Sequence, residues 1–351
     1  MNSNWQQFLQ QNGAIVKDGH VAHFSDPDHE FSLYQADNLL CDLSDMDLLS
    51  ITGVDAKQFL QGQLTCDLEQ VNDTQFQLGA LCTPKGRTIA SFRLIQLGDQ
   101  YVLQTPSQMG APTQQTLNKY IIFSKAETQL NTNQWVCFGL MGAQSHAILQ
   151  SAVPDTDLPT LPNGMSTCTQ PDFQGVRIIR DFSQYPRYLI IAPLDKANAL
   201  WQTLQTQCQA ISNQAWALQD IIAGYGQITP ALSEQVLPHN LNYQAIEAVN
   251  FKKGCYTGQE VVARMQYKGK LKTQMFIAYA DLSTAPEINQ PLLNTDTGKT
   301  QGQIINVCQV SAQRYALLLT LPKEAINSTA YRINDQEAGT ITIEPAPYAI
   351  T

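Results

Sequence analysis

The chain has 351 residues, of which 43% are hydrophobic and only 15% are charged, and its net charge is −9. This length allows two or three domains, and the acidic balance argues against general coating of nucleic acid. No apolar run approaches the ~18 residues that span a bilayer, and the N-terminus lacks the basic and apolar regions of a signal peptide. We therefore expect a cytoplasmic protein without membrane contact.

Taken in chain order, the local patterns predict two α/β units. The first unit begins with a strand at 47–52 and a helix at 56–61 that Asp55 caps. Two strands at 76–82 and 88–96, joined by a Pro-Lys-Gly turn, and a second helix at 114–120 follow. The second unit starts near Thr128. A strand at 135–140 and a helix at 143–151 precede a proline-containing loop, and strands at 177–181 and 188–192 and a helix at 196–208 follow it. The loop spans residues 151–175, and a further helix is predicted at 216–223.

After about residue 272 the pattern changes to short strands separated by turns. The predicted strands are 275–279, 302–310, 315–321, 331–333 and 339–343. Closely spaced short strands are typical of a small antiparallel barrel or sandwich. The predicted fold class is therefore α+β, with two related α/β units and a C-terminal antiparallel β-barrel.

The stretch NFKKGCYTGQEVVARMQYKGK, residues 250–270, differs from ordinary core or surface. Cys255 follows two lysines and lies between Gly254 and Gly258, which permit tight turns. Thr257 to Glu260 match a capping box, which predicts a helix that starts there. Cys255 would then lie just ahead of a helix N-terminus, where peptide amides and the helix dipole favour an anion.

This setting predicts a reactive thiolate at Cys255, since nearby positive charge lowers a thiol pKa. The alternative is a buried cysteine that packs as a small apolar side chain, which we expect for the other seven cysteines. The eight cysteines contain no CxxC pair, which favours reduced thiols over disulfides or a zinc site. His239 is either a partner of Cys255 or a loop residue, and the histidines near residues 20–29 do not have metal-binding spacing.

The positive charge of the chain is concentrated in one segment. Residues 252–272 hold six cations against one anion, a local charge of +5, so the remainder carries −14. Such a segment fits a phosphate, a polyglutamate tail or one RNA segment. A solvated helix face is the alternative.

The run Lys253-Gly-Cys-Tyr-Thr-Gly-Gln-Glu260, continued by Val-Val-Ala-Arg264, resembles the signature of YgfZ-type folate-binding, tRNA-modifying proteins. Mitochondrial relatives of this family act in iron–sulfur protein maturation. The resemblance extends to the segments 51–68, 117–127, 216–228 and 343–350. The family is similar in fold to the T-protein of the glycine cleavage system, a tetrahydrofolate-dependent aminomethyltransferase.

The resemblance to the T-protein implies three domains arranged in a ring around a central folate cavity. The implied boundaries are a discontinuous first α/β domain of residues 1–127 with 213–265, a second α/β domain of residues 128–212, and a barrel of residues 266–351. The cofactor implied is tetrahydrofolate or a derivative.

The chain departs from the T-protein where that enzyme carries its functional groups. No carboxylate occurs in the segment Gly86–Ser91, no glutamate in Phe182–Tyr188, and no arginine in the helix Trp216–Gly224. Without the carboxylate that activates the folate amine, aminomethyl transfer is poorly supported. The YgfZ-type pattern places a tryptophan on that helix, matched by Trp216, whereas a second family tryptophan is Met46 here.

The sequence therefore favours a folate-binding auxiliary factor that supports iron–sulfur enzymes, including tRNA-modifying ones, through Cys255. Partners would be iron–sulfur proteins or their assembly factors, no metal is expected, and direct contact with tRNA stays open. The alternatives are a tetrahydrofolate-dependent one-carbon transferase and a noncatalytic RNA-binding module. The residues assigned to the cofactor are Met46, Trp216, Lys253, Tyr256 and Arg264, and those assigned to shaping the loop are Gly254, Thr257, Gly258, Gln259 and Glu260.

Overall fold

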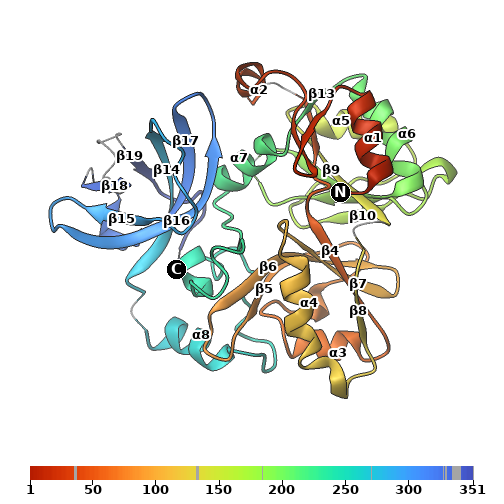
Figure 1. Cartoon of the computed structure of the whole chain (residues 1–351). Helices are drawn as coiled ribbons and strands as arrows, with labels where there is room; N and C mark the ends of the chain where they lie inside the picture. Colours follow the sequence, from red (N-terminus) through yellow and green to blue (C-terminus); the bar gives the residue numbers. More distant parts are fainter. Residues whose placement is uncertain are drawn as a thin grey trace.

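The computed structural model describes residues 1–351 except 35–37, 132–133, 184, 270, 327, 329, 334–340 and 351. Across the described residues, three large sheets of five, six and six strands carry the fold. They lie on three sides of helix α7 (Gln214–Ile222) and the segment after it (Figure 1). The predicted mixed α and β architecture is confirmed, whereas the ring arrangement stays a prediction.

The five-stranded sheet has the order β5-β6-β7-β4-β8 and is antiparallel throughout. Its elements follow the chain as β4 (Asp47–Thr52), α3 (Ala56–Gln61), β5 (Gln77–Cys82), β6 (Thr88–Leu97), β7 (Gln100–Thr105), α4 (Gly110–Asn118) and β8 (Glu127–Leu130). The predicted strands and first helix are confirmed. The predicted cap is wrong, because the Asp55 carboxylate makes no hydrogen bond to the helix start and instead accepts one from the Lys125 amide at 2.8 Å. The second helix begins earlier than predicted, because the N–H of Gly110 donates to a carboxylate oxygen of Asp47 at 2.8 Å.

The second sheet repeats this connectivity. Its elements are β9 (Trp135–Met141), α5 (Ser145–Ala152), β10 (Met165–Thr167), β11 (Arg177–Arg180), β12 (Arg187–Pro193), α6 (Leu194–Gln205) and β13 (Gln209–Ile211). The strand order is β10-β11-β12-β9-β3-β13, which matches the first sheet except that β3 (Leu39–Asp42) is inserted before the last strand. The two α/β units are thus related in topology. The prediction of an uninterrupted loop at 151–175 is wrong, because β10 pairs with β11 after the last of three closely spaced prolines.

The N-terminal residues form elements that the sequence patterns did not predict. These are α1 (Ser3–Gln11), β1 (Ile15–Lys17), β2 (His20–His23), α2 (Pro27–Leu33) and β3. The side chain of Asn2 accepts hydrogen bonds from two amides of α1, and the helix buries Trp5 in an aromatic cluster with Phe138 and Trp201. The apolar side chains of α1 and β2 therefore pack with the second sheet, which β3 joins, although the predicted boundaries placed these elements in the first domain.

The C-terminal sheet is antiparallel, as predicted, with the order β18-β15-β16-β17-β14-β19. Its strands are β14 (Thr273–Asp281), β15 (Pro291–Asn294), β16 (Lys299–Gln309), β17 (Arg314–Pro322), β18 (Tyr331–Ile333) and β19 (Ile341–Glu344). Over the described residues this order is open, with β18 and β19 at its ends, so the strands form a half-barrel. The sheet has its own apolar core, in which Phe276, Leu317 and Leu319 are fully buried.

The segment between α7 and the C-terminal sheet contains η4 (Pro238–Leu241) and α8 (Gln259–Tyr267). The other single-turn helices are η1 (Leu68–Gln70), η2 (Ile121–Phe123), η3 (Pro171–Phe173) and η5 (Lys323–Ala325). In the part of the chain that the structure describes, no helix combines the length and the apolar character needed to cross a bilayer.

Candidate functional site

A cavity of about 200 Å³ lies beside α7. Its walls come from the β3–β4 connection, the residues after β7, α7 itself and the segment that follows α7. The side chains used in the argument below are Asp45, Met46, Trp216, Asp220, Gln227 and Thr229. Two of the five residues assigned to the cofactor, Met46 and Trp216, thus line one cavity although they are far apart in the sequence.

This cavity, the α7 cavity, has polar groups without partners in its wall. The indole Nε1 of Trp216 and the hydroxyl of Thr229 are buried and make no hydrogen bond with any described residue. Buried polar groups are normally paired, so such atoms beside a cavity mark positions where a ligand can bind. Asp45 adds a carboxyl group whose pKa is raised by burial, and which accepts a hydrogen bond from the Nδ2 of Asn213 at 2.9 Å.

Four buried charged side chains lie behind the indole. Arg93 on β6 binds Asp181 through two hydrogen bonds of 2.8 Å. Arg187 on β12 binds Asp181 at 2.8 Å and Asp220 on α7 at 2.5 Å. Burial disfavours the ionised form of Asp181, but Arg187 and Arg93 hold its pKa below the usual value. This buried ion network joins the first sheet, the second sheet and α7.

The network also fixes Trp216. The guanidinium carbon of Arg187 lies 4.5 Å from the centre of the indole ring, and Arg187 Nη1 donates to the Trp216 carbonyl at 3.3 Å. Gly139 on β9 permits the close approach of the ring, because a Cβ there would lie 2.4 Å from Trp216 Cε3. Arg187 therefore covers one face of the indole, and the unpaired N–H is the polar group of Trp216 that a ligand can use.

Met46 connects the cavity to the same network. Its sulfur contacts the side-chain amide of Gln104, whose oxygen accepts a hydrogen bond from Arg93 at 3.2 Å. On the other face of α7 lies a larger cavity of about 820 Å³, which Arg187 also borders together with Tyr279 and Arg314. The helix thus separates two cavities.

Cys255 lies in a different place, on the loop before α8. The side chain of Asn250 accepts hydrogen bonds from the amides of Lys252 and Lys253, at 2.7 and 3.0 Å. On the other side of the cysteine, the amide of Thr257 donates to the Gly62 carbonyl at 3.2 Å. Between these attachments Cys255 is exposed, so the loop is fixed at both ends and presents its thiol to solvent.

Lys253 is the buried cation of this loop. Its ammonium group donates to the carbonyls of Leu64 and Cys66, at 2.8 and 2.6 Å, and lies 5.4 Å from the ring centre of Tyr256. Burial lowers the pKa of Lys253 to about 8. These contacts attach the loop to residues 64–66. The role predicted for Lys253 at a folate tail or a thiolate stays a prediction.

The capping box predicted at Thr257 and Glu260 is wrong. Helix α8 begins at Gln259 after Gly258, which has a φ of +85° and makes no side-chain cap. The hydroxyl of Thr257 instead contacts the side-chain oxygen of Gln63 at 3.2 Å, and Glu260 is exposed. The reason is tertiary, because a Cβ on residue 258 would lie 2.5 Å from the Thr83 carbonyl, so the β5–β6 turn packs against the helix start.

The predicted site residues therefore divide into two groups. Met46 and Trp216 lie at the α7 cavity, whereas Lys253, Tyr256 and Arg264 lie with Cys255 around α8 and do not line that cavity. Tyr256 is buried and its hydroxyl has no partner among the described residues, while Arg264 is exposed. His239 is buried against Phe251, with 6.1 Å between ring centres, which fits a structural residue.

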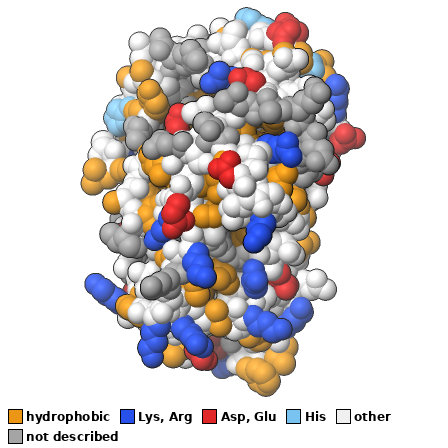
Figure 2. Space-filling view, turned by 90° about the vertical axis from the view of Figure 1, so that its left-hand side faces the viewer, with side chains coloured by type: hydrophobic (Ala, Val, Ile, Leu, Met, Phe, Trp, Pro, Cys, Tyr) orange, Lys and Arg blue, Asp and Glu red, His pale blue; other side chains and the backbone are white. Residues whose placement is uncertain are grey.

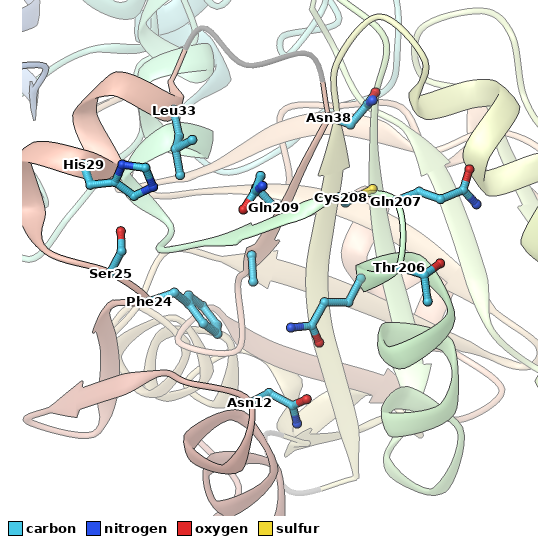
Figure 3. A pocket seen from close by; sticks show the side chains of 12 residues that line it. Asn12, Phe24, Ser25, His29, Leu33, Asn38, Thr206, Gln207, Cys208 and Gln209 are labelled. Atoms are coloured by element: carbon cyan, nitrogen blue, oxygen red, sulfur yellow. The ribbon is translucent and has the colours of Figure 1, made fainter.

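The other seven cysteines are buried, as predicted. Cys208 is the least buried of them, at 8% exposure, and burial raises its thiol pKa to about 11. It lines a cavity of about 620 Å³ between the N-terminal elements and α6, opposite His29 on α2 (Figure 3). Most of the side chains in this cavity are uncharged, and no residue predicted for the functional site lies there.

Sequence reasoning missed Asp45, Asp181, Arg187 and Asp220. Arg187 lies in the segment Phe182–Tyr188 that lacks the T-protein glutamate, and Asp181 directly precedes that segment. Nothing local distinguishes these two residues from surface charges. Among the described residues, no cluster of three or more histidine, cysteine or acidic side chains has a geometry that holds a metal.

Comparison with known proteins gives three findings. The family model described as the GCVT N-terminal domain matches residues 27–219. The chain is 30% identical to the tRNA-modifying protein YgfZ of Escherichia coli O157:H7 and 29% identical to that of Enterobacter sp. strain 638, in each case over 89% of this chain and 93% of the relative. The solved structure of glycine cleavage system aminomethyltransferase T from Bartonella henselae has a TM-score of 0.74 and 15% identity, over 99% of this chain and 97% of that one.

Proposed function

We propose that this chain is a folate-binding auxiliary factor that uses Cys255 in the maturation or repair of iron–sulfur enzymes. The chain belongs to the YgfZ family of tRNA-modifying proteins and carries the GCVT N-terminal domain. Enzymes that modify tRNA are among the clients. The observation that carries this proposal is the position of Cys255, the exposed cysteine among eight, on a loop attached at both ends. A thiol held in this way meets a partner without reorganisation of the loop.

The folate assignment rests on the α7 cavity. Its volume of about 200 Å³ is below the ~300–1,000 Å³ of typical sites for drug-sized ligands. It suits the bicyclic pterin ring, and the p-aminobenzoyl-glutamate part would lie outside. The pterin edge carries both donors and acceptors, which match the unpaired Trp216 N–H, the unpaired Thr229 hydroxyl and the Asp45 carboxyl.

The roles follow from these contacts. We assign the Trp216 N–H as a donor to the pterin, Asp45 as the acceptor for its amino groups, and Met46 as an apolar contact on the ring. The buried ion network keeps the indole in position, because Arg187 packs on its face. Cys255 acts outside this cavity, on a sulfur or metal group that a partner brings.

A one-carbon transferase is the alternative, and Asp45 is the observation that favours it. The segment Gly86–Ser91 has no carboxylate, and the Ser91 hydroxyl accepts a hydrogen bond from the Ile228 amide at 2.9 Å. Of the two carboxyl groups that line the cavity, Asp220 is bound by Arg187, so Asp45, with its raised pKa, is the one that could move a proton. In a transferase, Asp45→Asn would abolish folate turnover by the purified protein. In an auxiliary factor there is no turnover to lose.

Folate binding is tested by titrating tetrahydrofolate and following tryptophan fluorescence. The chain has four tryptophans, so the comparison is between Trp216→Phe and Trp201→Phe, which removes a buried tryptophan of the second core. We expect the fluorescence response to be lost in Trp216→Phe and kept in Trp201→Phe. A response that is unchanged in Trp216→Phe would exclude the α7 cavity as the site.

The role of Cys255 is tested in cells that lack the protein. Cells supplied with Cys255→Ala should lose iron–sulfur enzyme activity, whereas cells supplied with Cys208→Ala should keep it. Both purified variants should unfold at the same urea concentration as the wild type. Full activity with Cys255→Ala would end the proposal.

A further inference from the structure

Several exposed cations lie on the segments around Cys255. Helix α8 buries Val262 and exposes Glu260, Arg264, Tyr267 and Lys268. Residues spaced three and four apart lie on one face of a helix, so these four side chains form one exposed stripe. The stripe leads away from the loop that carries Cys255.

Three further segments add cations near the stripe. The β5–β6 turn packs on α8, since a Cβ at Gly86 would lie 2.9 Å from the Cβ of Val261, and this turn carries the exposed Lys85 and Arg87. Lys252 precedes Cys255 in its loop, and Lys272 follows α8. We call these six side chains the basic surface: Lys85, Arg87, Lys252, Arg264, Lys268 and Lys272.

The basic surface is not neutralised by its own protein. None of its six cations makes an ion pair with another described residue, in contrast to Arg93 and Arg187 in the core. Figure 2 shows the side of the molecule that carries the C-terminal sheet and α8, and Lys and Arg side chains collect on its lower half. On a chain of net charge −9, such a surface attracts and orients an anionic partner.

We propose that the basic surface docks the acidic face of a partner protein and so brings the sulfur or metal group of that partner to Cys255. This inference rests on the proposed function and adds the charge of the partner to it. Two observations favour a protein over an RNA strand. The surface contains an exposed thiol, which reacts with sulfur or metal rather than with phosphate. Glu260 lies at the end of the stripe next to the loop of Cys255, where it would repel a phosphate chain, whereas a folded protein can place a cation opposite it.

The proposal is tested with small disulfides of opposite charge. The thiolate of Cys255 attacks one sulfur of the probe, the S–S bond breaks, Cys255 becomes a mixed disulfide, and the other half leaves as a thiolate. The anionic probe is 5,5′-dithiobis(2-nitrobenzoate) and the cationic probe is cystamine, each compared with its rate toward free cysteine. We expect Cys255 to favour the anionic probe by about tenfold at low salt, and this preference to disappear near 1 M salt, where the Debye length is about 3 Å.

Charge reversal near the thiol sharpens the test. Arg264→Glu should slow the reaction with the anionic probe by about three- to tenfold and speed up the reaction with cystamine. The matched control is Lys17→Glu, an exposed lysine on β1, which packs on α1 at the side of Figure 1 opposite α8. This control should leave both rates unchanged. Because the salt dependence is measured on the wild type, the test does not depend on the folding of a variant.

Competition distinguishes the two kinds of polyanion. Poly-L-glutamate should protect Cys255 from the anionic probe, and transfer RNA at the same concentration of charge should protect it less. Equal rates for both probes, or no effect of salt, would overturn the proposal even if Cys255→Ala fails in cells. Protection by RNA and not by poly-L-glutamate would also overturn it, since the surface would then bind RNA.

Discussion

The regions around α7 and α8 hold charged groups in opposite ways. At α7, Arg93, Arg187, Asp181 and Asp220 are buried and each cation has an anion within hydrogen-bonding distance. At α8, the cations of the basic surface are exposed and have no ion-pair partner among the described residues. Charge in the first region therefore holds the units together, whereas charge in the second region is available to a partner. Four measurements on variants test these two regions.

The largest effect is expected from breaking the buried ion network. Arg187→Met leaves Asp181 and Asp220 short of a cation in the core, which should lower the free energy of unfolding by about 3–5 kcal/mol. Urea unfolding measures this change. The matched control is Arg314→Met, which removes an exposed arginine 5.7 Å from the ring centre of Tyr279 and should cost less than ~1 kcal/mol. Equal losses in the two variants would contradict the contrast.

The next effect concerns the two glycines that flank Cys255. Gly258→Ala places a Cβ 2.5 Å from the Thr83 carbonyl in a backbone with a φ of +85°, so we expect a loss of about 2–4 kcal/mol. Gly254→Ala meets nothing within 4 Å and should cost less than ~1 kcal/mol. Thermal unfolding of both variants gives the comparison. If Gly258→Ala unfolded at the same temperature as the wild type, the β5–β6 turn would not fix the start of α8.

The burial of Lys253 should make the free energy of unfolding depend on pH. Its folded-state pKa of about 8 lies below that of an ordinary lysine near 10.4, so the unfolded chain holds this proton more tightly. The cost of burying the charge is fully present below pH 8 and is relieved as pH rises through 8 toward 10. The free energy of unfolding of the wild type relative to Lys253→Met should therefore rise by about 1–3 kcal/mol between pH 8 and pH 10.

The control for this measurement is Lys252→Met, because Lys252 is exposed. The difference between the wild type and this variant should stay constant over the same pH range. Parallel pH curves for Lys252→Met and Lys253→Met would mean that the ammonium group of Lys253 is as well solvated in the folded chain as in the unfolded one.

The smallest effect on stability is expected at Cys255 itself. Cys255→Ser replaces an exposed thiol by a hydroxyl and should change the free energy of unfolding by less than ~0.5 kcal/mol. The same substitution should remove the fastest site of alkylation by iodoacetamide at pH 7.5. In the wild type Cys208 should react next and much more slowly, because it is nearly buried and its thiol pKa is raised to about 11. Peptide mapping after timed alkylation identifies the order, and equal labelling of both cysteines would refute it.

Much of the secondary structure was accessible from the sequence because it depends on local patterns. The strands of both α/β units and the helices at 56–61 and 196–208 follow from apolar spacing and turns. The start of α8 did not follow, although Thr257 and Glu260 have the capping spacing. Its geometry is fixed by the Thr83 carbonyl, a residue of another strand connection. Competition between a local cap and a distant contact leaves no mark in the local sequence.

The candidate site was predictable where a single side chain has a distinctive neighbourhood. The lysines and glycines around Cys255 predict a reactive thiolate, and the structure exposes that thiol, while its reactivity stays a prediction. Of the five residues assigned to the cofactor, Met46 and Trp216 line one cavity and the other three do not. The ion network was not predictable, because Arg93, Asp181 and Asp220 look like surface charges until β6, β11 and α7 are brought together. Their burial depends on tertiary pairing, which one sequence does not encode in any short segment.

The insertion of β3 into the second sheet has a consequence for biosynthesis. Strand β13 pairs only with β3 among the described strands, and β3 also pairs with β9. On the ribosome, β3 emerges before any strand of the sheet it joins, so it must stay unpaired while the whole first unit is made. A nascent chain stalled in this interval exposes an apolar strand, Leu39–Asp42, to other chains. We therefore expect these four residues to be a site where chaperones bind the nascent chain.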